Sequence, residues 1–160
     1  QTFVPSATQT PGRLNLFQFK HFQFLVDFAH NPAGLELLCD FVSKLDGEPK
    51  VGIISGTGDR RDEDIKELGR ISGRHFDEII IRQDKNLRGR TAEEIVNLLV
   101  EGINETKTKE IPLNIIYNEK EAIMHAYNNA KPGSLITIMC DVVAEALDLI
   151  KGLKEKEDEE

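Results

Sequence analysis

Short apolar runs alternate with longer amphipathic segments along this chain, and that alternation constrains the fold more than any other feature. The runs cover residues 22–26, 51–54, 79–81, 113–116 and 135–139. Each is short enough for a buried strand, and apolar residues at helical spacing follow it, as Leu35, Leu38 and Val42 follow the first run. Strands joined by single helices make right-handed crossovers. The sequence therefore predicts an α/β domain of three layers, with a mainly parallel sheet and helices on both faces.

Aromatic residues crowd the N-terminal part of the predicted sheet. Residues 14–19 alternate loosely before the run at 22–26, which predicts a hairpin or a paired edge strand. Five of the eight Phe residues lie here: Phe17, Phe19, Phe22, Phe24 and Phe28. Because no basic cluster accompanies them, we interpret them as core packing rather than as a surface that stacks nucleic-acid bases.

Composition limits the classes of partner. A chain of 160 residues has the usual size of one domain, and no apolar stretch is long enough to span a bilayer, so we predict no membrane segment. The net charge of −8 argues against binding to a phosphate backbone, so we predict no nucleic-acid partner. Cys39 and Cys140 lie in apolar segments without CxxC spacing, which indicates buried free thiols and fits a cytoplasmic location.

The two ends of the chain differ in composition from the middle. Residues 1–12 are rich in Thr, Pro, Ser and Gly, which predicts a linker from a missing upstream domain. Residues 153–160 are mostly Lys, Glu and Asp, which predicts a solvated charged tail. Residues 13–152 are left as the folded domain.

The best candidate for chemistry is the turn at residues 27–32, between the first run and its helix. At the carboxyl end of a parallel strand, Asp27 could accept hydrogen bonds from ribose hydroxyls, and His30 could donate to a phosphate or an acyl oxygen. The alternative is that Asp27 only caps the helix and His30 is a surface residue. Pro32 suits the start of a helix under either interpretation.

Two further turns carry charge after a predicted strand. In residues 56–64, Arg60 and Arg61 could contact an anion, and three acidic residues after them suit the start of a helix, although a solvated turn is as plausible and no Walker A loop is present. In residues 84–90, Arg88 and Arg90 could clamp a carboxylate or a phosphate, although such loops are commonly only solvated.

Local patterns also predict caps and argue against other chemistry. Thr91 with Glu94 forms a capping box, and Asn118 is predicted to cap the helix after residues 113–116. The four His residues lack ligand spacing, so we predict no metal site, and no Ser lies in a nucleophile elbow.

Taken in order, these motifs resemble the C-terminal domain of the Mur ligase superfamily, and most closely its cyanophycin synthetase branch. Asp-Phe-Ala-His-Asn-Pro at residues 27–32 resembles the family's first turn, Gly-Asp-Arg-Arg-Asp-Glu-Asp at 58–64 its second, and Asp84 with Arg-Gly-Arg at 88–90 its third. Pro-Gly-Arg-Leu-Asn at 11–15 resembles the start of that domain. The match runs from residue 11 to about residue 150.

The resemblance implies a Rossmann-like domain that closes over a central ATPase domain in an enzyme that forms an amide through an acyl phosphate. It places Asp27 on the ATP ribose, His30 and Asn31 near the phosphates or the acyl phosphate, and Asp84 and Arg88 near the incoming amino acid. It implies ATP and Mg²⁺, with the Mg²⁺ ligands in the missing central domain, and it allows a homo-oligomeric full-length protein. No complete catalytic set lies in these residues, so the isolated domain is expected to be inactive.

Other functions stay open at this point. Within the same class, the chain could come from a Mur-type peptidoglycan ligase or a folylpolyglutamate ligase. In a different class, it could be a non-catalytic module that binds a nucleotide or an amino acid.

Overall fold

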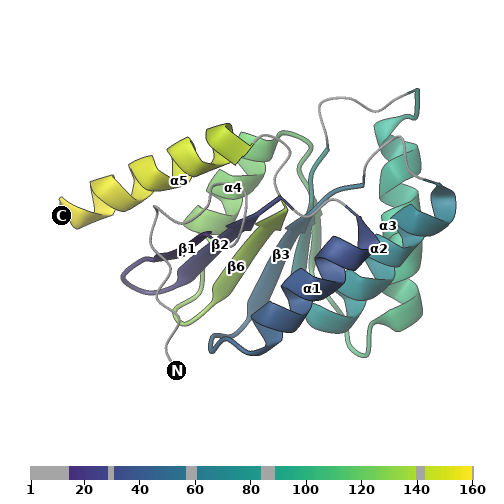
Figure 1. Ribbon diagram of the computed structural model, residues 1–160, viewed down its shortest axis with the longest axis horizontal. Coiled ribbons are helices and arrows are strands. Elements are labelled where there is room, and N and C mark those ends of the chain that lie inside the picture. The colour runs from purple at the N-terminus through teal and green to yellow at the C-terminus, as the bar shows by residue number, and fades with distance from the viewer. Residues whose placement is uncertain (1–14, 29–30, 57–60, 84–88, 140–142, 160) are drawn as a thin grey trace.

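The chain folds into one six-stranded, mostly parallel sheet with helices on both faces (Figure 1). The computed structural model describes residues 15–28, 31–56, 61–83, 89–139 and 143–159. The elements are β1 (Asn15–Gln18), β2 (Gln23–Asp27), α1 (Pro32–Ser43), β3 (Lys50–Ile54), α2 (Asp62–His75), β4 (Glu78–Ile81), α3 (Ala92–Thr106), β5 (Leu113–Ile115), α4 (Glu119–Asn128), β6 (Leu135–Met139) and α5 (Val143–Asp158). The strand order is β1-β2-β6-β3-β4-β5, and every pair except β1-β2 is parallel. The predicted fold class is confirmed.

The aromatic N-terminal region forms the predicted hairpin. β1 pairs antiparallel with β2, and Phe19 and Phe22 stack in the connection with 5.0 Å between ring centroids, where the Tyr127 ring meets both edge-on. Phe17 and Phe24 are buried as well, so core packing is confirmed for these four residues. It is wrong for Phe28, which is 41% exposed just beyond the end of β2.

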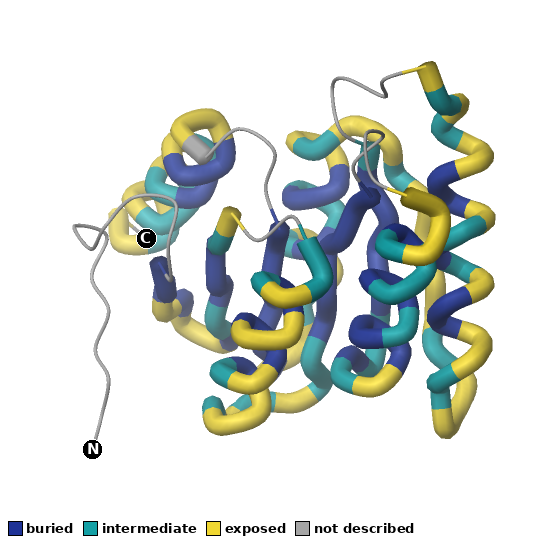
Figure 2. Tube along the Cα trace, turned by 45° about the vertical axis from the view of Figure 1, so that its right-hand side comes forward, coloured by how far each residue is buried: buried dark blue, intermediate teal, exposed yellow. Residues whose placement is uncertain are grey.

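Side chains alternate between two cores, one on each face of the sheet. Ile79 and Ile81 point into the core shared with α1, α2 and α3, whereas Ile80 between them points into the core shared with α4 and α5. The strands in the middle of the sheet are accordingly buried along their length, and the helices expose their outer sides (Figure 2). The alternation of strands and helices in the sequence thus becomes a three-layer structure.

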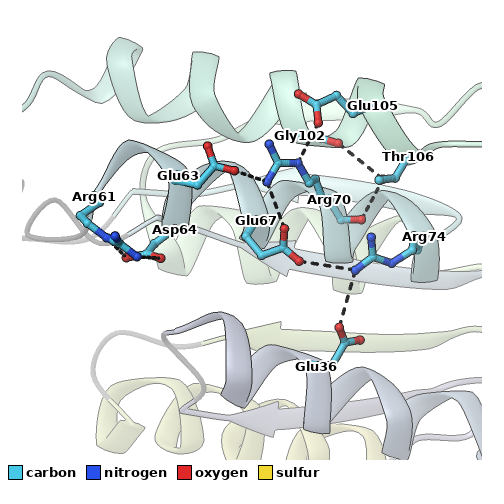
Figure 3. Close-up of polar contacts among 10 residues, drawn as sticks. All are labelled: Glu36, Arg61, Glu63, Asp64, Glu67, Arg70, Arg74, Gly102, Glu105 and Thr106. Atoms are coloured by element: carbon cyan, nitrogen blue, oxygen red, sulfur yellow. Dashed lines mark hydrogen bonds and ion pairs between the residues drawn. The ribbon is translucent and has the colours of Figure 1, made fainter.

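Helices α2 and α3 pack with their backbones in contact, because glycines face each other across the interface. A Cβ placed on Gly69 would meet the carbonyl oxygen of Leu99, and one placed on Gly102 would meet that of Lys66. Around this contact, Arg70 of α2 forms ion pairs with Glu63 at 2.6 Å and with Glu105 of α3 at 2.7 Å (Figure 3). The close backbone approach and the ion pairs therefore hold α2 and α3 together as one packed layer on this face of the sheet.

Two parts of the structure differ from the sequence-based expectation. β5 is an edge strand whose residues are all exposed, with Ile115 at 48%, so the helices do not cover this end of the sheet. Residues 153–158 continue α5 instead of forming a separate tail: Leu153 packs on the core, and Glu157 accepts a hydrogen bond from the Lys20 N–H at 2.8 Å. No helix among the described residues is long and apolar enough to cross a membrane.

Candidate functional site

The described residues on either side of the turns singled out in the sequence lie at the carboxyl edge of the sheet. The parallel strands end there, and the chain leaves β2, β3 and β4 toward α1, α2 and α3 on one face but leaves β5 and β6 toward α4 and α5 on the other. Since β6 lies between β2 and β3, the connections diverge on both sides of it. A divergence of this kind opens a crevice outside the strand ends, which is where open α/β sheets bind ligands.

The first turn contributes Asp27 and the start of α1. Asp27 is the last residue of β2, is half-buried, and lies in register with Met139 at the end of β6. The helix cap is Asn31, whose Oδ1 accepts a hydrogen bond from the Gly34 N–H at 2.7 Å. The alternative interpretation, in which Asp27 caps α1, is therefore wrong. His30 lies outside the described residues.

In the described part of the second turn, the positive charge of Arg61 is balanced by a neighbouring carboxylate. The Arg61 guanidinium donates to both carboxylate oxygens of Asp64 at 3.2 Å (Figure 3), and this hydrogen bond raises the pKa of Arg61 above its usual value. The predicted acidic first turn of α2, Asp62 to Asp64, is confirmed. Arg60 lies outside the described residues, and an anion contact from either arginine stays a prediction.

The third turn is tied to the second. Arg90 forms an ion pair with Asp62 at 2.7 Å, so the anion clamp predicted from Arg90 would have to compete with this carboxylate. Thr91 and Glu94 form the predicted capping box at the start of α3, and Asn118 caps α4 as predicted. Asp84 and Arg88 lie outside the described residues.

A cleft of about 870 Å³ opens at this edge, between α4 and α5. It extends from the segment after β4 to the first turns of both helices. Its lining includes Gln83, Tyr117, Glu119, Lys120, Glu145 and Asp148. Three carboxylates against one ammonium make the described lining acidic, and the half-exposed Tyr117 ring supplies an apolar and aromatic wall. Such a lining suits a ligand that carries a cationic or a hydrogen-bond-donating group.

Sequence reasoning missed Arg82, a buried arginine beside this cleft. Arg82 is 2% exposed, and its guanidinium donates to the carbonyl oxygen of Met139 and pairs with Glu119 at 3.2 Å. One signal could have identified it: a charge directly after the run Ile79–Ile81 continues the strand's alternation and must point into the core on the α4 and α5 side.

The described residues contain no group of three His, Cys, Asp or Glu side chains that could hold a metal ion. Cys39 is buried, as predicted. Burial, and to a smaller extent the nearby Glu36 carboxylate, raise the pKa of this thiol to about 12. Cys140 lies outside the described residues.

Comparisons with known proteins place the chain in a family. The family described as Mur ligase, glutamate ligase domain, matches residues 12–141. The cyanophycin synthetases of Crocosphaera subtropica and Synechocystis sp. are 41% and 40% identical to the chain over 94% and 96% of its length. The chain spans about 17% of the length of these curated relatives.

Solved structures show the same fold. A UDP-N-acetylmuramoyl-L-alanyl-D-glutamate--2,6-diaminopimelate ligase superposes with a TM-score of 0.69 at 22% identity, over 81% of this chain and 26% of that one. E. coli FolC in complex with ADP superposes with a TM-score of 0.67 at 19% identity, over 93% of this chain and 33% of that one. The resemblance seen in the motifs is confirmed, and the chain belongs to the Mur ligase family, as its glutamate ligase domain.

Proposed function

We propose that this chain is the C-terminal domain of an ATP-dependent acid–amino acid ligase of the cyanophycin synthetase type. In this proposal it forms one wall of the site at which ATP and an amino acid or peptide meet, and the amide forms through an acyl phosphate. The observation that carries the proposal is that β2, β3 and β4, the strands that precede the three motif-bearing turns, all end at one edge of the sheet. The identity of 41% to a cyanophycin synthetase favours this branch of the family.

The nucleotide side of the wall is assigned to Asp27, His30 and Asn31. Asp27 ends β2 at the carboxyl edge of the sheet, where its carboxylate could accept hydrogen bonds from ribose hydroxyls. The first turn of α1, which the structure describes in full, carries no acidic residue that would repel a phosphate. Because Asn31 uses its oxygen as the cap, its amide nitrogen is the group that could donate to a phosphate.

The amino-acid side is assigned to Asp84 and Arg88, with the adjoining cleft. Gln83 both lines this cleft and directly precedes Asp84, so the cleft and the third turn belong to one region of the edge. Closure over a central ATPase domain would then bring the amine to the acyl phosphate, and catalysis would come from positioning and charge stabilisation.

The partners of this domain follow from the same proposal. The central ATPase domain of the same protein supplies the phosphate loop and the Mg²⁺ ligands. The full-length protein works in the cytoplasm, as a homo-oligomer in the simplest case, and the isolated chain does not turn over.

The test is ATP-dependent amide formation by a full-length protein that carries this chain. Asp27→Asn should raise the KM for ATP by on the order of tenfold, because a charged acceptor for the ribose is lost. Asp40→Asn is the matched control, since Asp40 lies on the exposed side of α1 and its carboxylate pairs with Lys44 at 3.4 Å. Amide formation from ATP by the isolated 160-residue chain would contradict the assignment of the catalytic machinery to another domain.

Two alternatives predict different results. A Mur-type or folylpolyglutamate ligase would use a peptidoglycan precursor or a folate in the same assay instead of a cyanophycin-type acceptor. A non-catalytic module would bind nucleotide usefully as the isolated chain and lose that affinity in Asp27→Ala, whereas the ligase proposal expects weak or no binding because half the site is absent.

A further inference from the structure

Arg82 joins parts of the carboxyl edge that the sheet itself does not connect. It follows the last residue of β4, and its Nε lies 2.9 Å from the carbonyl oxygen of Met139, the last residue of β6. A second guanidinium nitrogen, Nη2, donates to the same oxygen. Since β3 lies between β4 and β6, the side chain reaches past the end of β3 to hold the end of a non-neighbouring strand.

The same guanidinium reaches the α4 side of the cleft. Arg82 Nε lies 3.2 Å from Glu119 Oε2, and Glu119 is the first residue of α4 and a lining residue of the cleft. The backbone around Arg82 is fixed too, because its N–H donates to Ile54 and the next N–H, of Gln83, donates to Tyr117. One side chain thus ties the ends of β4 and β6 to the start of α4.

A buried ion pair is a poor means of gaining stability alone. Desolvating the two charges costs about as much as their attraction returns, and an apolar residue of similar volume would serve the core at least as well. The planar, forked guanidinium of Arg82, unlike an apolar side chain, holds its two acceptors, the Met139 carbonyl oxygen and the Glu119 carboxylate, in one fixed geometry. The position of this fork beneath the cleft makes that geometry relevant to a ligand.

We propose that Arg82 is a positioning residue for the amino-acid side of the site, acting through Glu119 and the end of β6. It holds the Glu119 carboxylate and the Met139 backbone at a fixed spacing, so that the cleft keeps its shape when substrate binds. This inference rests on the proposed ligase function.

The test uses the full-length protein and steady-state kinetics with each substrate varied in turn. Arg82→Met should raise the KM for the amino-acid substrate by on the order of tenfold or more and leave the KM for ATP within about twofold. Arg82→Lys should fall between wild type and Arg82→Met, because one ammonium can replace the contact to Glu119 or to Met139 but not the fork. Arg74→Met is the control, since Arg74 also pairs with two carboxylates, those of Glu36 and Glu67, but lies at the C-terminal end of α2, away from the carboxyl edge of the sheet. Both KM values should stay unchanged in this variant.

A thermal comparison separates positioning from a failure to fold. Arg82→Met removes a cation from beside the Glu119 carboxylate, so the double variant Arg82→Met/Glu119→Gln should melt at a higher temperature than Arg82→Met while keeping the raised amino-acid KM. If the double variant recovers both melting temperature and amino-acid KM, or if Arg82→Met lowers kcat alone, the positioning role is overturned. A wild-type protein without ligase activity would sink the proposed function and this inference with it, whereas an active wild type with unaffected Arg82 variants overturns this inference alone.

Discussion

Replacing Gly69 or Gly102 by Ala should destabilise the domain, although both changes favour an isolated helix. In each case the added Cβ would overlap a backbone carbonyl oxygen of the neighbouring helix, that of Leu99 for Gly69 and that of Lys66 for Gly102. A side chain could rotate away from such an overlap, but a helical carbonyl cannot. Helices α2 and α3 would have to move apart.

The size of the effect is the difference between two opposing contributions. Alanine in place of glycine in the middle of a helix gains about 1 kcal/mol. Forcing an extra carbon into a packed interface typically costs about 1–3 kcal/mol, and because a helical backbone must shift at both of these sites, we take a cost of about 3–4 kcal/mol here. Separation would also loosen Leu68, Leu99 and Ile103, which are at most 3% exposed, so we expect a net loss of about 2–3 kcal/mol in the free energy of unfolding. For a chain of this size that corresponds to a fall in Tm of roughly 4–12 °C.

The assay is urea unfolding followed by far-UV circular dichroism, and α5 offers a matched control. A Cβ added to Gly152 meets no atom within 4 Å, so Gly152→Ala should gain roughly 0.5–1 kcal/mol from helix propensity alone. Opposite signs for Gly69→Ala and Gly152→Ala are the expected outcome. If Gly69→Ala gained as much as Gly152→Ala, the two helices would not be in backbone contact and the reasoning would be refuted.

Two further predictions concern titratable groups. Burial alone would raise the pKa of Asp77, but hydrogen bonds from Lys109 and from the Lys50 N–H outweigh it and hold the pKa below the usual 3.8. A depressed pKa in the folded state stabilises the protein above the unfolded-state pKa, and that contribution is lost as the pH falls through the folded-state pKa. Asp77→Asn should therefore lower the free energy of unfolding by about 1 kcal/mol at pH 7 and by much less at pH 3 in urea titrations, and an equal loss at both pH values would contradict the ion-pair account. Burial, and to a smaller extent the Glu36 carboxylate, raise the pKa of the Cys39 thiol to about 12. In a Cys140→Ser background, Cys39 should therefore react with a thiol reagent at pH 8 only as fast as the chain unfolds. Rapid labelling of the native chain would contradict this burial.

The parts of the fold that the sequence predicts are those set by neighbouring residues. Strands and helices follow from the spacing of apolar residues, and the caps at Thr91 and Asn118 follow from a side chain that reaches an N–H three residues away. The turns fall at the carboxyl edge for the same reason, because every parallel strand must end there. Local pattern is therefore enough to place the candidate site on the fold.

What the sequence does not predict depends on which strands are neighbours. The insertion of β6 between β2 and β3 is a property of the whole chain, and without it neither the crevice beside Asp27 nor the reach of Arg82 to Met139 can be foreseen. The continuation of α5 to Asp158 is not foreseen for a similar reason. Leu149 and Leu153 of α5 pack against the core that includes side chains of β1 and β2. Composition alone shows the charged residues of this segment but not that its leucines have a core to pack against.

The charges at the edge favour one helix start over the others for an anionic ligand. At α2, the first turn carries Asp62, Glu63 and Asp64, and these already form ion pairs with Arg90, Arg70 and Arg61 respectively. An anion there would have to displace a carboxylate and would meet the remaining acids. At α1, the first turn carries no acid, and its cap uses a neutral amide, so the positive end of the helix dipole is left uncompensated within the described residues. A phosphate is therefore expected to bind near the start of α1, in the turn that contains His30, rather than near the start of α2, in the turn that contains Arg60 and Arg61.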